Sequence, residues 1–116
     1  MFGKRYEVTL NRVHDNIVIR EGDEVLKLTV NGDTMRMVAG LNKAQKQMIE
    51  LKDDSSDEQV KEVAEYFAAV IFGKEQAAAL MKFYAEDPAC VISVCGKYFK
   101  ERLAGKIAKA QKKIKV

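Results

Sequence analysis

The stretch that decides the fold is residues 87–114, which read DPACVISVCGKYFKERLAGKIAKAQKKI. Asp87 can cap a helix, and Pro88 fits its first position, where a missing N–H costs nothing. Apolar residues then recur every three or four positions, which is the spacing of one helix face. They are Ile92, Cys95, Phe99, Leu103, Ile107, Ala110 and Ile114. The pattern predicts one amphipathic helix of about 25 residues.

This helix is long for its chain. The 116 residues have room for a single domain, residues 1–116. A helix of about 25 residues reaches roughly 38 Å, whereas a compact domain of this size has a radius of gyration of about 13 Å. The strand layer or the first helix could cover the far end of the stripe. If neither does, the stripe is a surface for a partner or a second copy, and the candidate binding residues are Phe99, Leu103, Ile107, Ala110 and Ile114.

Three shorter helices are predicted before the long one. Apolar spacing of three and four residues begins at Thr34, where Asp33 or Thr34 can cap the helix, and continues to about residue 51. A second helix, capped by Ser56 or Asp57, is expected to end at Gly73, because glycine adopts the left-handed conformation without a steric penalty. A third runs from about residue 74 to residue 84. Residues 33–116 therefore form a helical part with about four helices.

Residues 1–32 have the pattern of β-strands instead. Apolar and polar residues alternate over 6–10 and over 25–30, and residues 17–19 are β-branched. Gly22 and Asp23 provide a turn before the last of these strands, and His14 is expected in a loop. The predicted fold class is α+β and mainly helical, with a short N-terminal antiparallel β-meander followed by the helices.

The sequence offers little for catalysis. His14 is the single histidine, and the two cysteines, Cys90 and Cys95, lie in an apolar segment that raises a thiol pKa. Neither the spacing of metal ligands nor a glycine-rich phosphate loop is present. We therefore expect a protein that is not an enzyme, with no catalytic residue, no cofactor and no metal site.

Charge is divided unevenly along the chain, although the net charge is only +3. Residues 50–65 carry seven acids and two lysines, whereas residues 97–116 carry eight bases and one acid. The basic end provides the main alternative function, which is nucleic-acid binding through phosphate contacts. The residues that would make those contacts are Arg102, Lys106, Lys109, Lys112 and Lys113.

Membrane association is not expected. No apolar run approaches the roughly 18 residues that a membrane-spanning helix needs. The N-terminal residues lack the apolar segment of a signal peptide, which favours a cytoplasmic protein.

Four short segments of the helical part carry a resemblance to a known family. They are FGKEQ at 72–76, LMKFY at 80–84, DP at 87–88 and YFKERL at 98–103, followed by the lysine-rich end. In this order they resemble the small tail assembly chaperones of long-tailed, siphovirus-type bacteriophages and prophages. The likeness covers residues 57–116.

The resemblance implies a protein without enzymatic activity that works in the cytoplasm of a bacterial host. Members of that family bind the tape measure protein, a long coiled-coil-forming chain, keep it soluble and recruit tail tube subunits. A tape measure or tail tube protein is therefore the expected partner. A structural component of the virion is a further alternative, and so is a small nucleic-acid-binding protein.

Overall fold

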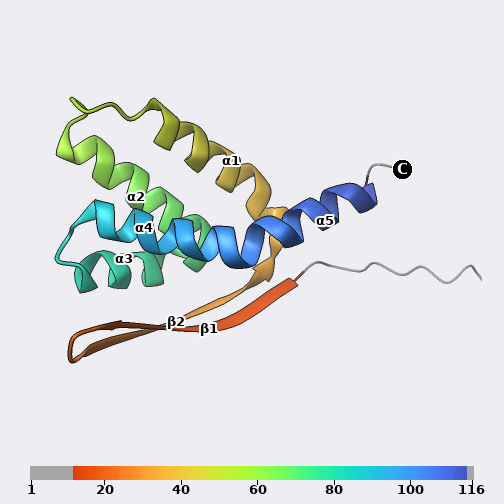
Figure 1. Ribbon diagram of the computed structural model, residues 1–116, viewed down its shortest axis with the longest axis horizontal. Helices are drawn as coiled ribbons and strands as arrows, with labels where there is room; N and C mark the ends of the chain where they lie inside the picture. The colour runs from red at the N-terminus through yellow and green to blue at the C-terminus, as the bar shows by residue number, and fades with distance from the viewer. Residues whose placement is uncertain (1–11, 115–116) are drawn as a thin grey trace, which may run out of the picture.

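A computed structural model describes the backbone of residues 12–114 and the side chains of residues 12–109 (Figure 1). The elements in chain order are β1 (Arg12–Glu21), β2 (Glu24–Asp33), α1 (Thr34–Glu50), α2 (Asp57–Phe72), α3 (Lys74–Phe83), α4 (Pro88–Tyr98), the π-helical turn η1 (Phe99–Leu103) and α5 (Ala104–Ile114). Because α4, η1 and α5 follow one another without a break, they form one long helix, the fourth. The predicted α+β, mainly helical class is confirmed.

The two strands form a long antiparallel hairpin beneath the helices (Figure 1). Their register is unbroken from Arg12 opposite Asp33 to Glu21 opposite Glu24. Gly22 begins the two-residue turn with φ +60°, a value that glycine adopts readily and that tight hairpins require. The face toward the helices carries most of the apolar side chains of the hairpin, which are Val13, Ile17, Ile19, Leu26, Leu28 and Val30, whereas Val18 and Val25 are exposed.

The structure corrects the expectation for the start of this hairpin. His14 was predicted in a loop, but it lies in β1 opposite Asn31. The segment is extended because β2 continues to Asp33 and offers a backbone partner to every residue of β1. Among the described residues the meander consists of two strands, and the predicted strand at 6–10 lies outside them.

The predicted helix starts are confirmed. The Asp33 carboxylate accepts a hydrogen bond from the Met35 N–H at 2.9 Å, and Asp87 accepts one from Ala89 at 3.0 Å. Ser56 forms a reciprocal capping box with Gln59, in which each side chain accepts the other residue's N–H. These side chains satisfy amide groups that the first turn of a helix leaves without partners.

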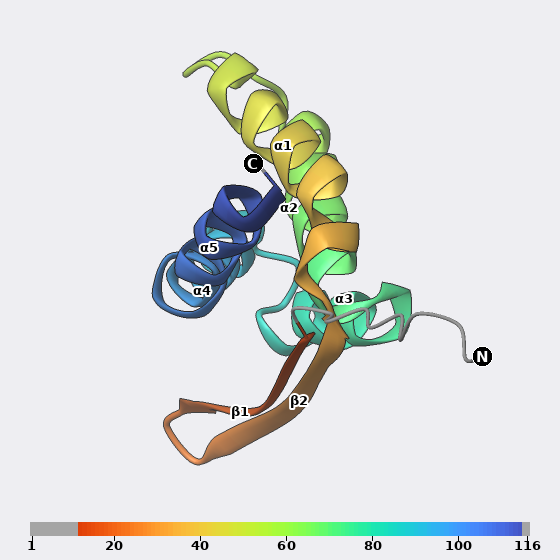
Figure 2. The same ribbon diagram turned by 90° about the vertical axis from the view of Figure 1, so that its right-hand side faces the viewer.

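The core lies between the hairpin and the helices. Helix α2 contacts α1, α3, α4 and β2, so it occupies the centre of the bundle (Figure 2). At Gly40 of α1, a Cβ atom would lie 2.9 Å from a methyl group of Val70 in α2, so glycine is needed for this close approach. The largest fully buried apolar side chains are Leu80, Met81, Leu103, Val13, Val30 and Val91.

Helix α3 is tied to the edge of the hairpin. The Gln76 side chain accepts a hydrogen bond from the Thr29 N–H at 2.7 Å and donates one to the Thr29 carbonyl at 2.6 Å. Beyond α3, Ala85 and Glu86 adopt left-handed backbone conformations with φ of 53° and 65°. The Glu86 N–H donates to the Met81 carbonyl at 2.8 Å, which closes the helix end.

The long helix departs from the prediction in its middle. At η1 the Ala104 N–H bonds to the Phe99 carbonyl, five residues back, instead of four. Such a turn holds one extra residue, so the following side chains are rotated by roughly 100° relative to a continuous α-helix. None of the helices formed by residues 12–114 combines the length and the apolar character needed to cross a membrane.

Candidate protein-binding groove

An apolar groove of about 240 Å³ separates α1 from the long helix. In Figure 2 the long helix lies to the left of α1 and α2, which overlap in this view. The buried Phe67 side chain of α2 forms the floor. The walls are formed by Val38, Leu41, Asn42, Gln45 and Met48 of α1 and by Ile92, Gly96, Phe99 and Ile107 of the long helix.

The π turn decides which residues of the predicted stripe reach this groove. Cys95 and Leu103 are fully buried in the core, with an exposed fraction of 0%. Phe99 and Ile107 are half-buried and line the groove. The extra residue in η1 turns Leu103 away from the Phe99 side and onto the side of Cys95, where the core lies. The stripe therefore divides into a buried row and a groove-lining row.

The described candidate partner-binding residues are thus divided between the core and the groove. Leu103 was predicted at a binding surface, but the structure places it in the core, because the π turn rotates it inward. Phe99 and Ile107 lie in the groove, partly open to solvent. Ala110 and Ile114 lie outside the described side chains. The stripe is therefore covered at Leu103 and partly open at Phe99 and Ile107.

Helix α1 continues the apolar surface beyond the groove. Ile49 has an exposed fraction of 76%, which is unusual for a large apolar side chain. It lies four residues after Gln45 and seven after Asn42, both of which line the groove, so the three residues share one helix face. The sequence predicted the apolar stripe of α1. It did not predict that part of this stripe forms a groove wall, because the groove depends on where the long helix packs.

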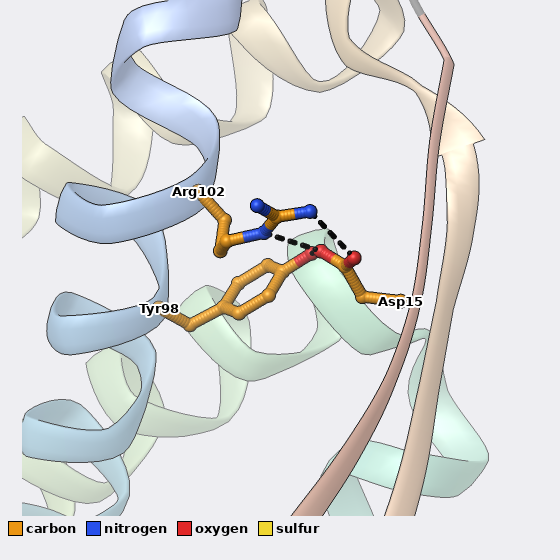
Figure 3. A network of polar contacts seen from close by, with 3 residues as sticks. All are labelled: Asp15, Tyr98 and Arg102. Carbon is orange, nitrogen blue, oxygen red and sulfur yellow. Dashed lines mark hydrogen bonds and ion pairs between the residues drawn. The ribbon is translucent and has the colours of Figure 1, made fainter.

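A polar network fixes the long helix to the hairpin next to η1 (Figure 3). Arg102 donates from Nε and Nη2 to the two carboxylate oxygens of Asp15, at 3.0 and 2.8 Å. The Tyr98 hydroxyl donates to the same carboxylate at 2.7 Å. These hydrogen bonds from Arg102 and Tyr98 lower the pKa of Asp15 to about 2. Asp15 thus anchors the helix on the side opposite the groove's α1 wall.

The same network bears on the nucleic-acid alternative. The Arg102 guanidinium, which could otherwise contact phosphates or bases, is engaged by Asp15 in a bidentate pair. Lys106 is half-buried and Lys109 is exposed, while Lys112 and Lys113 lie outside the described side chains. Among the described residues of the basic end, Arg102 is therefore the base held in an ion pair, whereas Lys97, Lys100 and Lys109 are exposed.

The cysteines and the histidine do not meet. Cys95 is buried, and burial raises the pKa of its thiol to about 12. Cys90 is half-buried and its thiol lies 3.4 Å from an Asp87 carboxylate oxygen, which also raises its pKa. His14 is exposed on the face of β1 that points away from the helices. Within residues 12–114, no three potential metal ligands of the His, Cys, Asp or Glu type converge.

Comparison with protein-family models, with curated proteins and with solved structures finds no match to this chain.

Proposed function

We propose that this chain is a binding protein that shelters an apolar segment of another protein in the groove between α1 and the long helix. The observation that carries the proposal is the pair Phe99 and Ile107. Both are half-buried side chains that line a groove whose opposite wall is also apolar, formed by residues such as Val38 and Met48. Burying such a surface against a partner is favourable by about 25 cal/mol for each Å² of apolar area.

The particular role that we propose is tail assembly chaperone of a long-tailed bacteriophage or prophage, with the tape measure protein as partner. The resemblance of residues 57–116 supports this role. A coiled-coil-forming chain exposes an apolar seam before it assembles, and such seams associate nonspecifically. A groove walled by two helices accommodates one helix edge of that kind, which suits a chaperone that keeps its partner soluble.

The test is co-expression with a tape measure protein of a long-tailed bacteriophage. We expect the full chain to keep the tape measure protein soluble and to co-purify with it. Gly96→Leu should abolish co-purification, because Gly96 lines the groove and no atom lies within 4 Å of the position that a Cβ atom would take. A leucine side chain at this position therefore starts from open space and extends into the groove.

Gly105→Leu is the matched control, since Gly105 is exposed, lies outside the groove and also has open space around its Cβ position. A tape measure protein that stays insoluble, or that binds both variants equally well, contradicts the proposal. Finding the chain in purified particles favours the virion component instead.

A further inference from the structure

Among the described residues, a lysine lies one helical turn from a groove-lining residue on each wall. Lys46 of α1 follows Asn42 by four residues, and Lys100 follows Gly96 by four, so each lysine lies beside a groove-lining residue of its own wall. Both lysines are exposed. Lys46 therefore lies beside the α1 wall, and Lys100 lies beside the wall formed by the long helix.

The nearest acidic residues in sequence face other surfaces. Glu101 follows Lys100, but it lines a separate hollow along β1, together with Ile17 and Val94. Glu50 ends α1, but it lines a hollow between α1 and α2, together with Gln59 and Glu62. The groove is thus mainly apolar inside, with Asn42 and Gln45 as its polar lining residues, and a lysine lies at the border of each wall.

The walls also determine which backbone conformation fits. Both walls are helices, whose backbone N–H and C=O groups are already bonded within the helix. An extended segment in this groove would lose the hydrogen bonds of its own backbone to water without gaining partners. A helix satisfies its backbone groups internally and presents apolar side chains at three- and four-residue spacing.

We infer that the groove takes an amphipathic helix of a partner protein whose apolar edge is bordered by acidic side chains. This inference rests on the proposed function, because it names the chemistry of the segment that the groove binds. Lys46 and Lys100 select the acidic border, and the apolar walls provide most of the affinity.

The probes are two synthetic helical peptides of about 21 residues, three heptads long, with leucine at the a and d positions. One carries glutamate at the e and g positions and the other lysine. Binding to the full chain is measured by fluorescence anisotropy at low and high salt. Exposed ion pairs contribute about 0.5 kcal/mol each, so two pairs should favour the acidic peptide by about fivefold at low salt. The preference should shrink at high salt because exposed charges are screened.

Lys46→Glu combined with Lys100→Glu should remove or reverse the preference while the chain still binds peptide. Lys27→Glu combined with Lys82→Glu is the matched control, since both of these lysines are exposed and lie on β2 and α3, away from the groove. Circular dichroism and thermal melting confirm that each variant is folded.

The outcomes distinguish failure of the inference alone from failure of both proposals. Equal affinity for both peptides, blocked by Gly96→Leu, overturns the acidic-helix inference and leaves the proposed function standing. Binding of neither peptide overturns both. Self-association of the chain that Gly96→Leu abolishes places a second copy in the groove and also overturns the inference.

Discussion

Asp15 of β1 and Arg102 of the long helix, separated by 87 positions in sequence, form a bidentate ion pair with a shorter N–O distance of 2.8 Å. Tyr98 completes the contact from one helical turn earlier. The pair connects the hairpin to the long helix at η1. The extra residue of η1 also turns Leu103 into the core, while Phe99 and Ile107 line the groove. The position of the groove's second wall thus depends on an anchor outside the groove.

Replacing Asp15 with Asn should lower the free energy of unfolding by about 1–2 kcal/mol at pH 7, since a pKa lowered to about 2 reflects stabilisation of the charged form in the folded state. The value is discounted because Arg102 is half-exposed to solvent. A lowered folded-state pKa gives stability that is complete above the unfolded value of about 4 and is lost as the pH falls through about 2.

Urea unfolding at several pH values measures this effect. The difference between the parent chain and Asp15→Asn should be constant from pH 5 to 7, values chosen to lie above the usual carboxyl pKa, and should shrink toward pH 2. A difference that does not vary with pH would show that the carboxylate charge contributes nothing.

Leu103→Ala and Ile107→Ala should have different consequences, although the two residues lie four apart in one predicted stripe. Leu103 is fully buried, so its truncation should cost about 2–5 kcal/mol of stability. Ile107 is half-buried in the groove, so its truncation should cost less and should weaken peptide binding. Chemical denaturation and anisotropy measure the two effects, and equal losses of stability would contradict the division of the stripe by the π turn.

The same substitution at two glycines should change stability in opposite directions. Gly96→Ala should stabilise the protein by about 1 kcal/mol, because alanine favours helix and no atom lies within 4 Å of the added carbon. Gly40→Ala should destabilise it by about 1–3 kcal/mol, because the added carbon would lie 2.9 Å from a Val70 methyl group. Thermal melting of the two variants measures both changes in stability. A loss of stability with Gly96→Ala would contradict the open space at this position.

Ala85→Gly should stabilise the protein by about 0.5–1 kcal/mol. Ala85 has φ +53°, a left-handed conformation in which the Cβ atom of alanine is strained and glycine is not. Ala78→Gly, on the exposed side of α3, is the matched control and should destabilise by about 1 kcal/mol. If both changes destabilise equally in urea unfolding, the turn after α3 does not have this conformation in solution.

Much of the fold was predictable because its signals are local. The caps at Asp33, Ser56 and Asp87 act on amide groups within three residues of themselves, so the sequence reveals where α1, α2 and α4 begin. Gly22 and Asp23 similarly indicated the hairpin turn. The left-handed pair Ala85 and Glu86 carried no such signal, since neither is a residue type that favours this conformation.

The candidate site was predictable only in part. Apolar spacing identified Phe99 and Ile107 as members of a stripe, and both line the groove. The π turn and the burial of Leu103 were not predictable from that spacing, because the apolar residues on either side of η1 keep the three- and four-residue intervals of a continuous helix. Asp15 follows His14, which was predicted in a loop. Its partners Tyr98 and Arg102 are 83 and 87 positions away in sequence, so no local pattern indicates the contact.

The sequence by itself determined the class of fold, the order of its strands and helices and the apolar face of each helix, because propensity, capping and periodicity act over a few residues. Only the tertiary structure decided which apolar residues the core covers and which line a groove. That choice depends on contacts between segments far apart in the chain, and no local pattern encodes the angle at which the long helix meets α1.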